Sequence, residues 1–73
     1  MIIFTKRLRD TREDRDLKQK NIADILEITY QQYQLYESGK RKMPIDKLKK
    51  LCEYYNISAD YFLGFTNKQK PIK

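Results

Sequence analysis

The chain has 73 residues, of which 16 are Lys or Arg and 10 are Asp or Glu, so its formal net charge at pH 7 is +6. This length predicts one small domain, and the basic balance favours a polyanionic partner, either nucleic acid or an acidic membrane surface. The sequence has no His and a single Cys, which excludes an intramolecular disulfide and the common zinc and iron–sulfur sites and argues against an enzyme or a bound cofactor.

The chain begins MIIFTKRLRD, a short apolar run that charged residues soon interrupt. Neither a signal peptide nor a membrane span fits this start, so we expect a cytoplasmic protein. A first helix is predicted from about Thr5 to Asp14, with Thr5 as its N-cap. Its apolar contribution comes mainly from Phe4 and Leu8.

A second helix is predicted from about Lys18 to Leu26, and a third from Thr29 to Ser38. Thr29 can cap the start of the third helix, and Gly39 can end it because glycine tolerates a positive φ. The two residues between these helices are Glu27 and Ile28. A turn this short sends the third helix off at a steep angle, which is a helix-turn-helix pattern.

These two helices share a consistent inner set of apolar side chains. Their spacing of three and four residues places them on facing helix surfaces. Ala23 matters among them because a small side chain lets the helices approach closely. The inner set consists of Ile22, Ala23, Leu26, Ile28, Tyr33 and Tyr36.

A fourth helix is predicted to begin at MPID, where Pro44 suits the first helical position and Asp46 favours the positive end of the helix dipole. Its residues at core spacing are Ile45, Leu48, Leu51, Cys52 and Tyr55. A short fifth helix is predicted from Ser58, as N-cap, to about Leu63. The expected architecture is all-α: a compact five-helix bundle over residues 1–64, followed by a basic, flexible tail over residues 65–73.

From Leu17 to Lys42, LKQKNIADILEITYQQYQLYESGKRK resembles the phage-repressor and Cro-type (Xre) helix-turn-helix family. The closing segment NISADYFLG, residues 56–64, is similar to the end of the same family pattern. The resemblance implies a lambda-repressor-like domain that binds double-stranded DNA, usually as a homodimer on a near-palindromic site. In that family the third helix, here residues 29–38, lies in the major groove.

The third helix carries three glutamines and no Lys or Arg, although the protein is basic. Gln31 and Gln34 are the leading base readers, because a glutamine amide can make two hydrogen bonds to adenine N6 and N7. Tyr30, at the start of the helix, is expected to reach an adjacent base or a phosphate, and otherwise is a simple exposed aromatic. Leu35 is placed to contact a thymine methyl group, although an exposed leucine there could also be incidental.

Phosphate contacts are expected from residues that flank the reading face, because such contacts set register without reading sequence. By their position in the family motif, the candidates are Gln19, Gln32, Ser38, Lys40 and Arg41. Arg12 and Glu37 match a pair that forms a partly buried salt bridge in many relatives, which implies a structural role.

Two departures from the family pattern concern helix ends. Glu27 stands where relatives often have glycine, in a turn that favours a positive φ. Arg15 and Asp16 replace an apolar residue and a glycine that are common before the second helix.

The leading functional hypothesis is a sequence-specific transcriptional regulator, most simply a repressor. The alternative is an antitoxin or adaptor whose helix-turn-helix fold mainly binds a protein partner. A membrane-surface role is disfavoured because the lysines do not gather on one helix face opposite an apolar face. For a homodimer, the expected contact residues are Met43, Pro44, Phe62 and Phe65.

Overall fold

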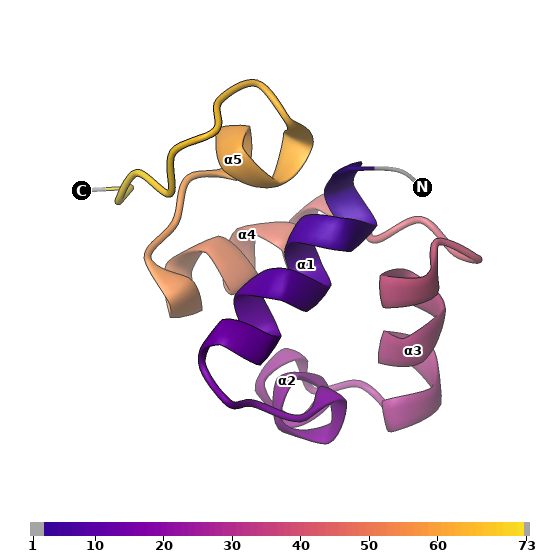
Figure 1. Cartoon of the computed structure of the whole chain (residues 1–73). Helices are drawn as coiled ribbons and strands as arrows, with labels where there is room; N and C mark the ends of the chain where they lie inside the picture. The colour runs from indigo at the N-terminus through magenta and orange to yellow at the C-terminus, as the bar shows by residue number, and fades with distance from the viewer. Residues whose placement is uncertain (1–2, 73) are drawn as a thin grey trace.

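The computed structural model describes residues 3–72, and within that range it contains five helices and no strand (Figure 1). This confirms the predicted all-α, five-helix architecture. The helices are α1 (Ile3–Asp14), α2 (Gln19–Leu26), α3 (Tyr30–Ser38), α4 (Ile45–Tyr55) and α5 (Ala59–Leu63). None of these helices is long and apolar enough to cross a membrane.

All five helices contribute buried side chains to one core. Helix α1 packs against α3 and α5, and α2 packs against α3 and α4 (Figure 1). The fully buried apolar side chains are Leu8, Ile22, Leu26, Tyr33, Leu51 and Phe62, each with 0% exposure. Phe62 was expected at a dimer contact, and its complete burial shows that this expectation is wrong.

Two predicted helix starts are also wrong. Helix α1 begins at Ile3, so Thr5 lies inside the helix, where it is buried, and it is not the N-cap. Pro44 is the N-cap of α4, with φ −62° and ψ 151°, and not its first helical residue. Ile45 is the first residue of α4 and is 83% exposed, although its spacing predicted a core position.

The turn between α2 and α3 has the backbone geometry that the sequence indicated. Glu27 has a left-handed conformation, with φ 58° and ψ 41°. Its N–H donates to the carbonyl of Asp24, and the N–H of Ile28 donates to the carbonyl of Ala23. These bonds satisfy two carbonyls at the end of α2 and turn the chain into α3.

Helix α4 supports the same turn through two lysine side chains. Lys47 Nζ donates to the backbone oxygen of Leu26 at 3.2 Å. Lys50 Nζ donates to Glu27 Oε1 at 3.1 Å. A cation at the negative end of a helix dipole is favourable, so Lys47 stabilises the end of α2.

Replacing Glu27 with glycine is expected to raise Tm by roughly 2–5 °C, because glycine adopts a positive φ without strain. Loss of the exposed Lys50 pair should matter little. Thermal unfolding followed by circular dichroism measures the change. Lys50→Ala, which removes the pair and keeps the backbone strain, is the control and should leave Tm nearly unchanged. A lower Tm for Glu27→Gly would mean that strain at this turn is not the dominant effect.

The segment after α5 returns to the helical body. Arg7 of α1 donates to the backbone oxygens of Tyr61 and Thr66, at 2.5 and 2.6 Å, and its guanidinium lies 4.4 Å from the centre of the Tyr61 ring. The N–H of Ser58 donates to the carbonyl of Lys70 at 2.8 Å. The Arg7 contacts join α5 and the segment after it to α1, and the Ser58–Lys70 bond joins the tail to the start of α5. The flexibility expected of the tail stays a prediction.

Candidate nucleic-acid interface

Helix α3 begins with a reciprocal cap that orients its first turn. The N–H of Gln32 donates to Thr29 Oγ1 at 3.1 Å, and the N–H of Thr29 donates to Gln32 Oε1 at 3.4 Å. Thr29 is therefore the cap that the sequence indicated. Gln32, expected at a phosphate, is half-buried and uses its side-chain oxygen in this cap, which leaves its amide nitrogen for another partner.

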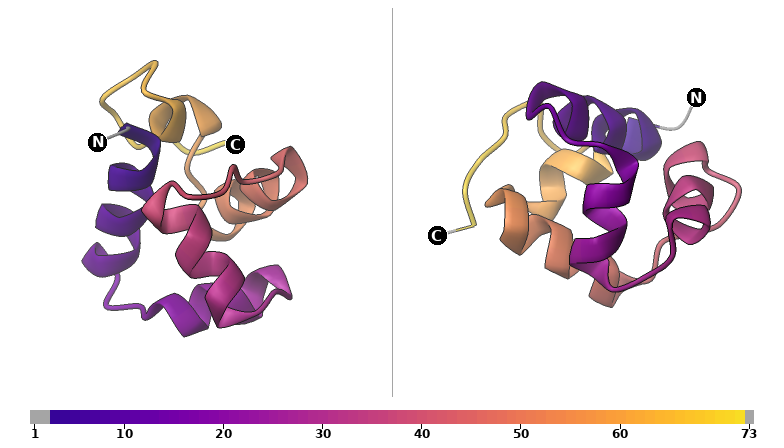
Figure 2. Two further views of the ribbon diagram at one scale, coloured as in Figure 1. Left: turned by 90° about the vertical axis from the view of Figure 1, so that its right-hand side faces the viewer. Right: turned by 90° about the horizontal axis from the view of Figure 1, so that it is seen from below.

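The two faces of α3 differ sharply in burial. Tyr33 and Tyr36 face the core, with 0% and 6% exposure. Gln31 and Gln34 are exposed on the other side, and Leu35 is half-buried. In the left view of Figure 2, α3 runs across the side of the bundle that faces the viewer, with α2 below it. The uncharged outer face of α3 is thus open to a partner.

Tyr30 and Gln34 lie one helical turn apart on that outer face. Tyr30 is 44% exposed, and its hydroxyl accepts a hydrogen bond from Gln34 Nε2 at 2.9 Å. Residues at i and i+4 are neighbours on a helix surface. The side-chain oxygen of Gln34 and the exposed amide of Gln31 remain available to a ligand. A donor and an acceptor side by side match the edge of an adenine in the major groove.

A buried ion pair ties α3 to α1. Arg12 donates to both carboxylate oxygens of Glu37, from Nε at 3.0 Å and from Nη2 at 2.9 Å. The two side chains are 11% and 4% exposed. Gln19 Nε2, from the start of α2, donates to the same carboxylate at 3.2 Å. Glu37 therefore joins α1, α2 and α3, and fixes α3 relative to the start of α2.

The charge state of Glu37 depends on these contacts. Burial by itself would raise the pKa of Glu37, but hydrogen bonds from Arg12 and Gln19 outweigh that effect and hold the pKa below its ordinary value of 4.5. The same hydrogen-bonded contact with Glu37 raises the pKa of Arg12. Both groups are charged at neutral pH.

This lowered pKa predicts acid sensitivity. A carboxyl group with a lower pKa in the folded state contributes stability above its unfolded pKa, and that contribution is lost as pH falls through the folded value. Wild-type unfolding free energy should therefore decrease as pH falls below the ordinary value of 4.5 for Glu37. Urea denaturation at a series of pH values measures the slope. Glu37→Gln should have a shallower slope, and an unchanged slope would assign the acid sensitivity to other carboxylates.

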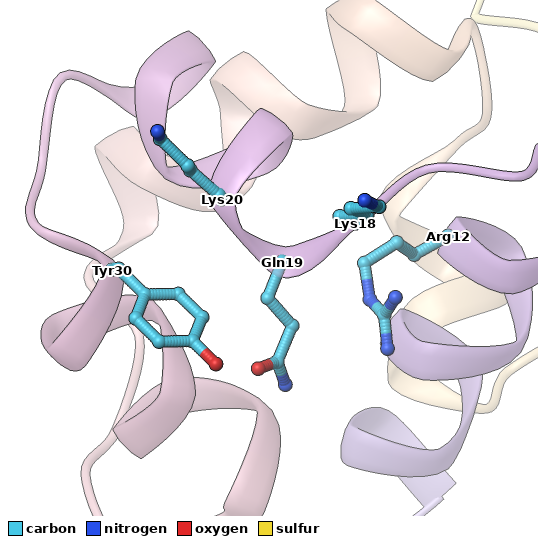
Figure 3. Close-up of a pocket in the computed structure, with 5 residues that line it drawn as sticks. All are labelled: Arg12, Lys18, Gln19, Lys20 and Tyr30. Atoms are coloured by element: carbon cyan, nitrogen blue, oxygen red, sulfur yellow. The ribbon is translucent and has the colours of Figure 1, made fainter.

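An open hollow of about 380 Å³ lies between the starts of α2 and α3. Figure 3 shows the amide of Gln19 and the hydroxyl of Tyr30 pointing toward the same space, with the Arg12 guanidinium at its far side. Lys18 and Lys20 complete the lining. Backbone N–H groups and the positive helix end at the start of α2 favour an anion here.

Lys18 and Lys20 were not among the residues selected from the sequence. The sequence nevertheless contained an indication of their role. They stand at the N-cap and the second residue of α2, where acidic side chains are usually found because they stabilise the positive end of the helix dipole. Cations at a positive helix end oppose the local electrostatics of folding. Such placement is typical of a surface that meets an anion.

The other end of α3 also carries positive charge. Gly39 ends the helix with φ 82°, and the N–H of Arg41 donates back to the carbonyl of Leu35 at 3.2 Å. Lys40 and Arg41 are exposed immediately beyond the helix. The hydroxyl of Ser38 donates to the same Leu35 carbonyl at 3.2 Å. The uncharged outer face of α3 thus lies between two groups of cations.

No group of His, Cys, Asp and Glu within residues 3–72 could hold a metal ion. Cys52, the single cysteine, is buried, and burial raises the pKa of its thiol. A thiol in that state is a poor nucleophile.

The comparisons with known proteins agree with this geometry. A helix-turn-helix domain model matches residues 5–68. Over 69 residues the chain is 35% identical to the uncharacterized HTH-type transcriptional regulator YobD of Bacillus subtilis, covering 94% of this chain and 62% of that protein. It is 39% identical over 59 residues to the HTH-type transcriptional regulator ImmR of Bacillus subtilis, covering 81% of this chain and 46% of that protein.

Two further similarities extend the comparison. The chain is 29% identical over 55 residues to the cryptic phage CTXphi transcriptional repressor RstR of Vibrio cholerae, covering 75% of this chain and 50% of that protein. The crystal structure of a transcriptional regulator from Listeria innocua superimposes with a TM-score of 0.80 at 29% identity, covering 89% of this chain and 61% of that one. In each case the chain spans less than two thirds of its relative.

Proposed function

The chain belongs to the helix-turn-helix family of transcriptional regulators, and we propose that it is a sequence-specific repressor that binds double-stranded DNA through α3 in the major groove. The observation that carries this proposal is the distribution of charge. The outer face of α3 is uncharged and exposed, and cations lie at both of its ends. A glutamine amide can pair with a base edge, and exposed Lys and Arg side chains bind phosphates without reading sequence.

In this proposal Gln31 and Gln34 read base edges, and Tyr30 contacts DNA beside them. Leu35 meets a thymine methyl group. Lys40 and Arg41 hold the backbone at one end of α3. The hollow beside Gln19 receives a phosphate at the other end. The two sets of phosphate contacts fix the register of α3 in the groove.

A homodimer on a near-palindromic operator completes the proposal. Two copies related by a twofold axis would place two α3 helices in successive major grooves, one helical turn apart. Of the residues expected at the dimer contact, Pro44 and Phe65 are exposed, Phe65 by 80%. A repressor of this kind acts by occupying the operator and excluding polymerase.

The test is selection of bound duplexes from a random DNA pool by the purified protein, followed by sequencing at moderate and raised salt. Enrichment of an inverted repeat, with half-sites about one helical turn apart, is the expected result. If the protein retained DNA in a salt-sensitive way without enriching any sequence, it would bind only the DNA backbone, and sequence-specific regulation would be rejected.

A further inference from the structure

An apolar groove of about 390 Å³ lies on another side of the bundle, between α1, the end of α3, and α4. Its lining includes Phe4, Tyr36, Met43, Leu48 and Leu63. The charged residues that line it are Arg41 and Lys42, and within residues 3–72 no carboxylate lines it. The groove therefore combines an apolar floor with a purely cationic rim.

We propose that this groove binds an acidic amphipathic segment of a partner protein. An apolar side chain of that segment would fill the groove, and carboxylates beside it would pair with Arg41 and Lys42. The volume is within the range of ordinary ligand pockets, and an amphipathic helix in a groove is a common form of peptide recognition.

The exposure of residues at the groove supports a missing partner. Ile45, which also lines it, is 83% exposed, and Leu63 is 47% exposed. Neither Ile45 nor Leu63 belongs to the hydrophobic core, which other side chains form. Grouped exposed apolar residues with a polar rim are typical of interaction sites.

The charge of the rim selects the kind of partner. A symmetric contact between two copies would use the same patch on both chains, so Arg41 and Lys42 of one copy would approach those of the other. An acidic segment reverses the sign of the interaction and complements the rim.

Partner binding would also control DNA binding, a consequence that rests on the proposed function. Arg41 lines the groove and lies next to Lys40, directly beyond the end of α3. A carboxylate paired with Arg41 would occupy a cation that the DNA backbone needs and would place negative charge beside it. Partner and DNA should therefore exclude each other.

The experiment uses a synthetic helix-forming peptide with leucines at i, i+3, i+4 and i+7 and glutamates at most other positions. Fluorescence anisotropy of the labelled peptide measures binding to the full chain without DNA. Ile45→Ser and Lys42→Glu, both at exposed positions, should each weaken binding on the order of tenfold. Lys68→Glu, which changes charge outside the groove, is the matched control and should have a much smaller effect.

A peptide with lysines in place of glutamates should not bind, and one with serines in place of leucines should bind weakly. Failure of the acidic peptide to bind, or equal loss in Lys68→Glu and Lys42→Glu, would overturn the proposal. Concentration-dependent sedimentation that Ile45→Ser abolishes would make a second copy the occupant and would also overturn it.

Competition is measured with the duplex obtained by selection. Saturating acidic peptide should release the protein from that duplex, and a stable ternary complex would reject mutual exclusion. If no duplex is enriched at all, the proposed DNA-binding function fails, while the peptide measurements still decide the groove.

Discussion

Replacement of Arg12 by methionine should lower the free energy of unfolding by about 3 kcal/mol, because it leaves a buried carboxylate without its ionic partner. The side chain of Glu37 is 4% exposed, and the hydrogen bond that remains from Gln19 carries no positive charge to balance the carboxylate. A loss of this size is a large share of the stability of a small domain. Urea denaturation at neutral pH, followed by circular dichroism, measures it.

A double variant provides the matched control. Arg12→Met combined with Glu37→Leu replaces the ion pair with two apolar side chains and should be markedly more stable than Arg12→Met alone. Lys6→Met, which removes an exposed ion pair with Asp10 on the same helix, should change stability little. Equal stability of the single and double variants would show that the unpaired Glu37 carboxylate is not the source of the loss.

The Arg12–Glu37 ion pair should affect DNA binding because it positions α3, and not because it contacts DNA. Glu37 joins α1 to α3 and accepts from Gln19 at the start of α2. Loss of Arg12 would loosen α3 relative to the hollow between α2 and α3. Both the reading face and one set of phosphate contacts would then lose their fixed spacing.

Replacement of Gln31 by alanine should weaken binding to the preferred operator by about 1–3 kcal/mol and should relax preference at one base pair. Gln31 is exposed on α3 and lies away from the core, so the fold should remain intact. Binding to the selected duplex and to single-base variants of it, measured by fluorescence anisotropy, gives both effects.

Lys40→Ala is the comparison for that variant. It should weaken binding to all duplexes alike. It should also reduce the slope of log binding constant against log salt concentration by about one, the value for one lost phosphate contact. Base preference should stay unchanged, since a phosphate contact carries no sequence information. If Gln31→Ala and Lys40→Ala behaved identically, the division between a reading helix and basic flanks would be rejected.

Features that depend on neighbours in the sequence were predictable. Thr29 caps α3 and Gly39 ends it, as their local patterns indicated, and Glu27 turns the chain with a positive φ, as the family resemblance implied. Caps and tight turns are formed by residues a few positions apart, so a local pattern contains most of the information that determines them. The five helices and the short α2–α3 turn follow from such patterns.

Features that depend on what covers a helix were less predictable. Ile45 has core spacing but is 83% exposed, because the first turn of α4 carries it away from the core. Phe62 was expected on the surface and is completely buried. Periodicity identifies the apolar face of a helix but does not show how far neighbouring helices extend over that face.

By itself the sequence determined a basic, all-helical domain with a helix-turn-helix and a third helix free of Lys and Arg. Tertiary structure alone decided that Gln19 meets Glu37, that Lys47 caps the end of α2, and that an apolar groove stays open beside Arg41. The physical reason is range. Helix caps and turns are local hydrogen-bonding arrangements, whereas side chains on different helices meet only after burial of the common core has fixed how those helices pack.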